Sequence, residues 1–549
     1  MRFDAKTKFV AVLALLTVGG AVAAIASAGQ GDPQLTPVPS ANTRSDGFAP
    51  ASVLSPELRQ VAVAQGSTKL ENPSALTSYY GYYNDVVNAS GAPQMLPTPT
   101  TNTEAQKSEP DKNTYLVFRH GLKGADPSYD YGTHFLFQGH EADVGGASYI
   151  TRINLDADGP HRVTLLATTD SGGHPIAAID GSTWEPWAQR LLFTTEDSSV
   201  PGVYSATPNY PSTVDDLSGS FGHAAYEGLQ DDSDGNIWLL EDSSGPFKNG
   251  TKAKAPHSFL YRFVPTKRGD LTRGKLQVLQ VLRNGTPITE ASQTALNTPD
   301  QLALHTYGQS FDTRWITIHD TTVDGTAVFS ANALAHTANA TPFKRPENGL
   351  FRPGTGFKEF FFDETGDTDA TSPENPHSGG WGSIFKLTQS RPSADSGKLT
   401  IFYNGDQAHA GFDNVAWLSK NEVTFVEDAG DGLHGQRNAL DSGWAFDATK
   451  DYSNPANRPV RWLAEGRDPS ATIDAANGGF GKNEGDNEIT GAHASDGDPG
   501  PGGILGAAIP HPWQGGEDED DQGEGDGQWR VFYTQQHGDN TTWEVLRAG

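Results

Sequence analysis

Three stretches that resemble β-strands each end in two adjacent acids, and acids at such positions can bind metal ions. They are "RLLFTTED", "NIWLLED" and "EVTFVED", which end in Glu196-Asp197, Glu241-Asp242 and Glu427-Asp428. Carboxylate oxygens are ligands that hard divalent cations prefer, with about 6–8 oxygens around each Ca²⁺. The alternative is that these acids are solvated turn formers, because acids often follow strands for that reason.

A second acid precedes the pairs and recurs in register. The stretch "FDNVAWLSKNEVTFVED" aligns without a gap with "YEGLQDDSDGNIWLLED", so that Asp413 falls on Glu227. Looser copies of this unit put Glu347 and Glu488 at the same leading position. An acid at a strand start, followed directly by Gly, Asn or Ile, has no role in a turn, so we predict the leading acids as metal ligands. The trailing acids are further candidates: Glu196, Glu427 and Asp428.

Arg345 suggests a second kind of chemistry. It stands two residues before Glu347 in "KRPENG", and Pro346 is expected to hold it in extended geometry. Side chains two residues apart in an extended chain point to the same face. A guanidinium beside bound cations can grip phosphate oxygens bidentately, so we predict Arg345 and Glu347 as catalytic residues. The spacing equally allows an ordinary Arg–Glu ion pair.

The elements that must position these residues are short strands. Runs of strand length recur beyond residue 110, are rich in β-branched and aromatic residues, and are bounded by Gly, Asp, Asn or Pro. Helical periodicity is nearly absent. Such a pattern indicates a sandwich, barrel or propeller, and the internal repeat in a long chain without a central linker favours a propeller. Acids at one position of a propeller repeat converge on the central channel.

The N-terminal part differs in composition from the rest. Residues 1–28 resemble a signal peptide, with basic residues, the apolar run "FVAVLALLTVGGAVAAIA" and the small-residue pattern Ala26-Ser27-Ala28. A retained membrane anchor is the alternative. We expect a secreted or periplasmic protein with no membrane insertion after cleavage. Residues 29–110 are rich in Pro, Ser and Thr and should be a partly ordered, irregular segment, followed by the β-propeller domain over 111–549.

Charge and cysteine content exclude several classes of function. Lys and Arg total 39 against 68 Asp and Glu, which gives a net charge of −29. Such a surface repels nucleic acid and concentrates cations. The chain has no cysteine, so disulfides, thiolate metal ligands and a cysteine nucleophile are absent. The acidic stretch over 515–527 lacks apolar residues and is expected to be a solvated loop.

These residues resemble the PhoX-type alkaline phosphatase family of secreted bacterial proteins. The matching stretches include "FQGHEADVGGASYITRINLD", "GSFGHAAYEGLQDDSDGNIWLLEDSSG", "RPENGLF", "FDNVAWLSKNEVTFVEDAGD" and "NEITGAHASDG", in the order that the family has them. The resemblance implies a six-bladed β-propeller whose channel holds calcium and iron ions and hydrolyses phosphate monoesters. It implies metal binding by Glu227 and Glu347 and phosphate contact by Arg345. Glu196, Glu427, Asp428 and Glu488 match acidic positions of the family's motifs.

The chain departs from the family at one metal ligand. Where the family has an iron-binding cysteine in the segment "AIDGSTWEPW", this chain has Asp180 nearby. A carboxylate binds Ca²⁺ or Fe³⁺ but lacks the softness of a thiolate, so we expect several Ca²⁺ ions and regard Fe³⁺ as open. Asp180 joins the predicted metal ligands.

We therefore expect a metal-dependent hydrolase of phosphate monoesters that acts on small phosphorylated substrates as a monomer. Metal ions would stabilise the phosphoryl oxygens and no protein nucleophile would be needed. The first alternative is a non-catalytic, calcium-binding propeller that binds another ligand. The second is a phosphodiesterase or phytase-like hydrolase on the same scaffold.

Overall fold

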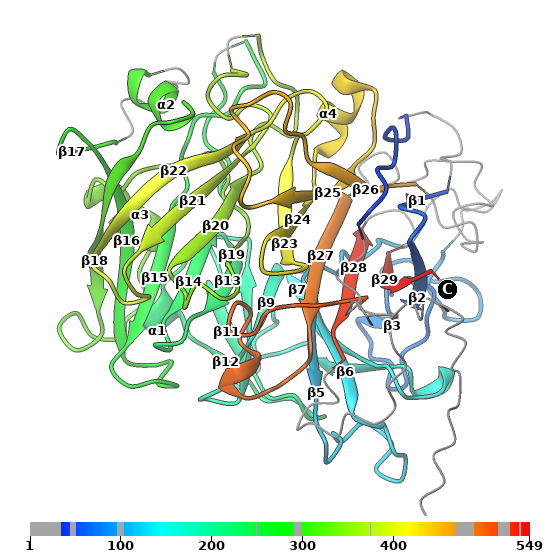
Figure 1. Cartoon of the computed structure of the whole chain (residues 1–549). Helices are drawn as coiled ribbons and strands as arrows, with labels where there is room; N and C mark the ends of the chain where they lie inside the picture. Colours follow the sequence, from blue (N-terminus) through cyan, green and yellow to red (C-terminus); the bar gives the residue numbers. More distant parts are fainter. Residues whose placement is uncertain are drawn as a thin grey trace, which may run out of the picture.

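The computed structural model describes residues 34–43, 51–95, 104–248, 250–289, 298–373, 375–466, 488–513, 528–536 and 540–548. Strands dominate these ranges (Figure 1). The α-helices within them are short: α1 (Ser218–Phe221), α2 (Pro299–Leu304), α3 (Ala331–Thr337) and α4 (Gly430–Arg437). The prediction of an all-β protein is confirmed. The expected signal peptide and the acidic stretch over 515–527 lie outside the described residues.

Among the described strands, four antiparallel sheets have four or five strands each, as propeller blades do. The first two are β5 (Thr114–Val117), β6 (His134–Val144), β7 (Ala147–Asn154) and β8 (Val163–Ala167), and β9 (Ile179–Glu185), β10 (Arg190–Thr195), β11 (Val203–Ala206) and β12 (Val214–Asp216). The other two are β23 (Phe412–Trp417), β24 (Glu422–Glu427), β25 (Ser442–Asp447), β26 (Val460–Ala464) and β1 (Val53–Leu54), and β27 (Glu488–Ser495), β28 (Arg530–Gln536), β29 (Thr541–Arg547) and β2 (Leu58–Ala64).

A larger sheet of ten strands lies between β12 and β23 in the sequence. Its first part contains β13 (Tyr226–Asp231), β14 (Ile237–Glu241), β15 (Leu260–Pro265), β16 (Gly274–Arg283) and β17 (Thr286–Pro287). Its second part contains β18 (Phe311–Asp320), β19 (Gly349–Phe351), β20 (Glu359–Glu364), β21 (Ser383–Gln389) and β22 (Ser396–Asn404). Strand β18 pairs with β16 on one side and with β22 on the other. A separate hairpin is formed by β3 (Thr77–Tyr79) and β4 (Tyr82–Tyr83).

The inner strands form a ring. Strands β5, β9, β13, β19, β23 and β27 each contact the next, and β27 contacts β5. Each of these strands begins an antiparallel meander that runs outward, so side chains at their starts share one axis. This propeller-like arrangement is what brings residues from distant parts of the sequence to a common centre.

The hydrophobic core lies in layers between neighbouring sheets. Phe361 and Phe402 of the ten-stranded sheet, for example, pack edge-on against Trp417 and Tyr452 of the next sheet. Burying a phenylalanine side chain stabilises a fold by about 1.5–3 kcal/mol, and strands with alternating apolar residues supply such side chains to both of their neighbours. The apolar layers leave the axis itself to polar side chains.

Strands from the two ends of the described chain complete the last two sheets. Strand β2 pairs with β29, and β1 pairs with β26. Residues of the N-terminal segment therefore form outer strands of sheets whose inner strands come from the C-terminal part. None of the helices in the described ranges is long and apolar enough to cross a membrane.

Candidate metal centre

The leading acids stand in a β-bulge that recurs at the start of inner strands. The register shifts around Glu227 and Gly228 in the β13–β14 pair, around Asp413 and Asn414 in the β23–β24 pair, and around Asp180 in the β9–β10 pair. A bulge bends its strand and re-aims the side chains within it. The repeat in the sequence is thus a repeated backbone feature that turns one acid per sheet toward the axis.

The residue after the leading acid is small where the neighbouring inner strand passes against it. A Cβ atom on Gly228 would lie 2.3 Å from the carbonyl oxygen of Glu347, which accepts a hydrogen bond from the Gly228 N–H at 2.7 Å. A Cβ atom on Gly181 would lie 2.1 Å from the carbonyl oxygen of Glu227. Neighbouring inner strands therefore touch at their bulges, and this contact brings successive leading acids together.

Each trailing acid follows the second strand of its sheet and is held there by one backbone hydrogen bond. The N–H groups of Glu196, Asp242 and Asp428 donate to the carbonyl groups that precede the inner strands, at 3.0, 2.8 and 2.7 Å. Successive side chains of an extended chain point to opposite faces. Only one member of each acid pair can therefore lie beside the leading acids.

Glu241 and Glu427, the first acids of their two pairs, lie instead among side chains packed between strands. Glu427 accepts hydrogen bonds from Trp444 Nε1 at 2.8 Å and the Ala410 N–H at 2.9 Å, and it forms an ion pair with Arg437 at 3.0 Å. Glu241 accepts a hydrogen bond from the Tyr261 hydroxyl at 2.8 Å. The structure therefore does not bring Glu427 to the leading acids, although the sequence made it a candidate ligand.

Carboxylate oxygens converge in three overlapping groups, within each of which they lie within 4.8 Å of one another. The groups are Asp111–Glu141–Asp180, Asp180–Glu196–Glu227 and Glu227–Asp242–Glu347. Because Asp180 and Glu227 are each shared by two groups, the three form one continuous arc. The arc extends from the sheet that begins at β5 to the segment just before β19.

Three further predicted acids lie next to this arc. Asn348 Nδ2 donates to Glu227 Oε1 at 2.8 Å and to Asp413 Oδ1 at 3.1 Å, which joins Asp413 to the arc. Burial raises the pKa of Glu488, and the charge of the neighbouring Asp428 raises it further. We call the whole set the axial acid group: Asp111, Glu141, Asp180, Glu196, Glu227, Asp242, Glu347, Asp413, Asp428 and Glu488.

Sequence reasoning missed three members of this group. Asp242 is the second residue of the recognised pair Glu241-Asp242. Of the two, only Asp242 faces the axis. Glu141 is held like the other trailing acids, by a hydrogen bond from its N–H to the Glu109 carbonyl at 2.8 Å. Asp111 precedes the first inner strand. A search for single acids at the repeat position, rather than for Glu-Asp pairs, would have found Glu141.

Mutual repulsion and burial act together on these carboxyl groups. Burial raises the pKa of Glu227 well above its ordinary range, and the charges of Glu347 and Asp180 raise it further. Burial and the charge of Asp413 raise the pKa of Asp111 to about 7. Acids that repel one another so strongly must bind protons or cations to stay buried.

Arg345 is the cation that most directly contacts the axial acid group. Its Nε donates to both carboxylate oxygens of Asp242, at 2.8 and 2.9 Å, and its Nη2 lies 3.0 Å from Glu347 Oε1. Burial opposes ionisation of Asp242, but the charge and hydrogen bonds of Arg345 outweigh it and lower the pKa. The ion pair with Glu347 that the spacing allowed as an alternative forms.

The expectation of extended geometry at Arg345 was wrong. Its φ is +55°, in the left-handed region, and its carbonyl group accepts a hydrogen bond from the Thr365 N–H at 2.8 Å. Ala178 and Gly411, which also stand two residues before an axial acid, have φ of +47° and +62°. The left-handed turn thus recurs in three of these segments, although Ala225 before Glu227 does not share it, and at Arg345 the preference before proline yields to the turn.

Lys112 is a second cation within the group, and no motif in the sequence pointed to it. It follows Asp111, and its Nζ donates to Asn414 Oδ1 at 2.7 Å, so the side chain reaches from the β5 sheet across to the β23 sheet. Burial lowers the pKa of Lys112, whereas the charges of Asp413 and Asp111 oppose this effect. One amine and one guanidinium thus lie among ten acids in the described part of the chain, so negative charge is in excess.

The donor set fits hard metal ions. Glu347 Oε2 and Asp180 Oδ1 are buried and have no hydrogen-bond partner among the described residues. Calcium prefers carboxylate, amide and carbonyl oxygens of this kind. Iron would have to be held by carboxylates here, because Asp180 takes the place where the resemblance implies a thiolate.

Family comparison agrees with this geometry over part of the chain. The family model described as "Alkaline phosphatase PhoX" matches residues 212–451, which confirms the resemblance over that segment. The segment contains Arg345 and five members of the axial acid group: Glu227, Asp242, Glu347, Asp413 and Asp428. No curated protein matches the chain by sequence.

Solved structures are similar at low identity. PhoX of Pseudomonas fluorescens in complex with vanadate, a transition state analogue, has 10% identity and a TM-score of 0.53, with 93% of this chain and 98% of that chain covered. A gluconolactonase of Xanthomonas campestris has 8% identity and a TM-score of 0.37, with 93% of this chain and 100% of that chain covered. At such identities the likeness concerns the fold alone.

Proposed function

We propose that this chain is a secreted, metal-dependent phosphatase that hydrolyses phosphate monoesters at the axial acid group. The observation that carries the proposal is the combination of converging buried acids with a guanidinium, Arg345, held at their edge. The match of residues 212–451 to the phosphatase family supports the same activity.

We further infer that the propeller has six blades. Strands β13–β16 and β19–β22 each form a four-stranded meander like the four separate sheets, and each begins at an inner strand of the ring. Strand β18 joins the two meanders by pairing with their outer strands, β16 and β22. The ten-stranded sheet is then two blades fused at their outer edges.

The axial acid group would hold several Ca²⁺ ions, and Fe³⁺ is compatible with a carboxylate at Asp180. Bound cations would supply Lewis-acid stabilisation of the negative charge on the phosphoryl oxygens. The leading acids Glu227, Glu347, Asp413 and Glu488, the trailing acids Glu196, Asp242 and Asp428, and Asp180 are the proposed ligands. Asp111 and Glu141 extend the same set.

Arg345 has a defined task in this proposal. Asp242 and Glu347 hold its Nε and Nη2 edges, which fixes the plane of the guanidinium. A guanidinium fixed in this way holds its positive charge beside the axial acid group, where it can stabilise negative charge that develops on the phosphoryl group in the transition state. Because protein ligands already set its orientation, little conformational entropy would be lost when substrate binds.

One observation favours a non-catalytic alternative. Asp180 stands where the resemblance implies an iron ligand with a thiolate. A protein that kept only its calcium-binding acids would be a calcium-stabilised binding module. Activity is therefore the property that separates the two functions.

The test is turnover of p-nitrophenyl phosphate at alkaline pH by protein loaded with Ca²⁺, with elemental analysis of the same sample. We expect turnover that a chelator abolishes. If fully metal-loaded protein hydrolyses no phosphate ester, the result would support the non-catalytic binding module instead. Turnover of bis-p-nitrophenyl phosphate alone would indicate a diesterase.

Neighbouring residues provide a matched pair of variants for the same assay. Glu196→Gln removes a member of the axial acid group, and we expect it to lower turnover and metal content. Asp197→Asn changes the next residue, whose side chain is exposed and caps a turn at the Ser199 N–H at 2.7 Å. It should leave both unchanged. Equal effects of the two substitutions would remove Glu196 from the proposed ligands.

We propose that residues 1–28 are cleaved on export, that the mature protein is a monomer, and that the inner strands of its propeller begin after residue 111, while β1 and β2 of the N-terminal segment complete two of its sheets. N-terminal sequencing of the exported protein and its mass in solution test these statements.

A further inference from the structure

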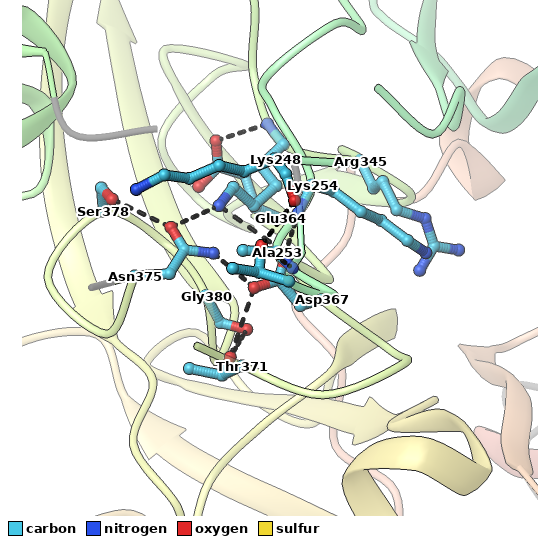
Figure 2. Close-up of polar contacts among 12 residues, drawn as sticks. Lys248, Ala253, Lys254, Arg345, Glu364, Asp367, Thr371, Asn375, Ser378 and Gly380 are labelled. Carbon is cyan, nitrogen blue, oxygen red and sulfur yellow. Dashed lines mark hydrogen bonds and ion pairs between the residues drawn. The ribbon is translucent and has the colours of Figure 1, made fainter. Parts of the chain in front are cut away.

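A lysine from a distant segment lies beside Arg345. Lys254, between β14 and β15, donates from Nζ to Thr368 Oγ1 at 3.0 Å, and Arg345 Nη1 donates to the same hydroxyl oxygen at 3.3 Å. Figure 2 shows Lys254 and Arg345 close together above the Asp367 and Asn375 side chains. Two cations therefore share one neutral acceptor.

The donors of Arg345 that remain available face Lys254. A guanidinium has five N–H donors. Nε and Nη2 are directed to Asp242 and Glu347. Nη1 has one hydrogen bond among the described residues, to the hydroxyl of Thr368. The edge of Arg345 that faces away from the axial acid group is therefore the edge with donor capacity left.

Lys254 also has donor capacity left. An ammonium group has three donors, and that of Lys254 has one hydrogen bond, to Thr368, and a carboxylate oxygen of Asp369 at 3.9 Å. Its side chain is only 7% exposed. Lysines are rarely so buried, and the acidic partner of this one, Asp369, is partly exposed and at 3.9 Å is too far away for a hydrogen bond.

A buried network holds both cations in place. The Lys254 N–H donates to Asp367 Oδ1 at 2.8 Å, and Lys344 Nζ lies 3.7 Å from the same oxygen and donates to Asn375 Oδ1 at 2.8 Å (Figure 2). The Lys344 N–H donates to Glu364 Oε1 at 2.8 Å. Asp367 thus ties the backbone that carries Lys254 to the residue next to Arg345.

An aromatic ring lies next to this pair at the surface. Phe247 is 44% exposed, and Lys252 and Lys254 have Nζ atoms 5.6 and 6.0 Å from the centre of its ring. A half-exposed ring can stack on a second flat group, and the neighbouring ammonium groups favour a ligand whose negative charge lies beside that flat group.

We propose that Lys254 and the Nη1 edge of Arg345 form a second anion site, which binds a phosphate on the leaving group of the substrate. The inference rests on the proposed function and names its preferred substrates, the nucleoside diphosphates, whose base stacks on Phe247. In the reaction, the bond from the terminal phosphorus to the bridging oxygen breaks. The oxygen of water bonds to phosphorus, and its protons pass to the products, orthophosphate and the nucleoside monophosphate.

The experiment compares two substrates in Ca²⁺-loaded protein: ADP, which has a second phosphate, and p-nitrophenyl phosphate, which does not. Lys254→Met keeps the apolar stem of the side chain and removes its charge. We expect it to raise the KM for ADP about tenfold, the effect of losing one charge-assisted hydrogen bond, and to leave the KM for p-nitrophenyl phosphate within twofold. Lys252→Met, in the same segment but 61% exposed, is the control and should change the KM for ADP less than threefold.

A binding measurement separates failure of this inference from failure of the proposed function. Calorimetry with α,β-methylene-ADP, which is not hydrolysed, should show about tenfold weaker binding to Lys254→Met than to the unchanged protein. Protein that hydrolyses neither substrate but shows this difference would overturn the proposed function and support the anion site. Equal affinities, or a parallel change in both KM values, would overturn the anion site. A thermal melt within a few degrees of that of the unchanged protein establishes that the variant is folded.

Discussion

Glu427 and Asp428 are neighbours in the chain, but they belong to two buried regions with opposite electrostatics. On the side of Glu427, Arg437 pairs with Glu427 at 3.0 Å and with Asp441 at 2.7 Å, and His434 Nε2 lies 2.9 Å from Asp441. We call this set the Arg437 cluster. On the side of Asp428, ten acids of the axial group meet Arg345 and Lys112.

The comparison separates a structural site from a candidate functional one. Burying a charge is unfavourable unless a partner and hydrogen bonds compensate it. In the Arg437 cluster the protein itself supplies a cation within 3.0 Å of both acids, although one carboxylate oxygen of Asp441 has no hydrogen-bond partner among the described residues. In the axial acid group, Arg345 and Lys112 are the cations found among ten acids in the described part of the chain, so most of the compensation must come from protons or metal ions. An excess of buried acids over cations is thus the better indicator of a binding site.

Loss of the axial guanidinium should have the largest effect. Arg345→Ala should lower kcat/KM for p-nitrophenyl phosphate by about 10³-fold, because a positioned arginine contributes that much to phosphoryl transfer. Steady-state kinetics measure it, with Arg268→Ala, an exposed arginine, as the control. Activity within tenfold of that of the unchanged protein would refute the assignment of Arg345.

Breaking the Arg437 cluster should affect stability and not chemistry. Arg437→Met leaves Glu427 and Asp441 buried without their cation, and such losses lower the free energy of unfolding by about 3–5 kcal/mol. Urea unfolding measures this change. Turnover per folded molecule and bound calcium should stay as they are. A variant that unfolds normally but loses calcium would place Glu427 among the metal ligands and break the comparison.

The metal-free protein should lose stability as pH rises, because its axial acids have raised pKa values. Burial raises the pKa of Asp413 to about 6, with the charge of Asp428 adding to it, and that of Asp111 reaches about 7. An acid whose pKa is higher in the folded state stabilises the fold fully below its unfolded pKa of about 4, and this contribution disappears as pH passes the folded value. The loss between pH 4 and pH 8 should be on the order of a few kcal/mol.

Melting temperatures in a chelator and in Ca²⁺ at pH 5 and pH 8 test this statement. The fall toward pH 8 should be large in the chelator and small in Ca²⁺, because the ions take over the compensation of charge. A metal-free protein that is equally stable at both pH values would show that the axial acids are compensated by the protein itself.

The smallest effect is expected from crowding the bulges. Gly228→Ala puts a Cβ atom 2.3 Å from the Glu347 carbonyl oxygen, so the β13 and β19 segments must move apart. Overpacking of this kind costs about 1–3 kcal/mol, and the shift should also weaken calcium binding. Gly159→Ala, where a Cβ atom meets nothing within 4 Å, is the control. Equal calcium affinity in both variants would mean that the bulge contact does not set the spacing of the acids.

Much of the fold was predictable from local pattern. Short alternating strands bounded by turn residues indicate an all-β protein, and an ungapped internal repeat with leading acids indicates a propeller, because both signals lie within about 20 residues of chain. The leading acids Glu227, Glu347 and Asp413 lie near one another, as the repeat predicted, and Asp180, which the resemblance had added, lies beside Glu227.

Other features of the site depend on contacts between sheets. Which residue of a Glu-Asp pair faces the axis is decided by the backbone hydrogen bond that ends each second strand, so Asp428 joins the axial acid group and Glu427 does not. The left-handed turn at Arg345 overrides the preference before Pro346, because the carbonyl group must meet the Thr365 N–H. Lys112 reaches its partner Asn414 over a separation that no local pattern encodes.

The sequence by itself determined that acids recur at a fixed place in a strand repeat, and therefore that a charged axis would form. The tertiary structure decided which of these acids meet, which are neutralised by Arg437, and where Arg345 and Lys254 face one another. The physical reason is range: strand periodicity acts between residues close in sequence, whereas the compensation of buried charge depends on what folding brings within a few ångströms.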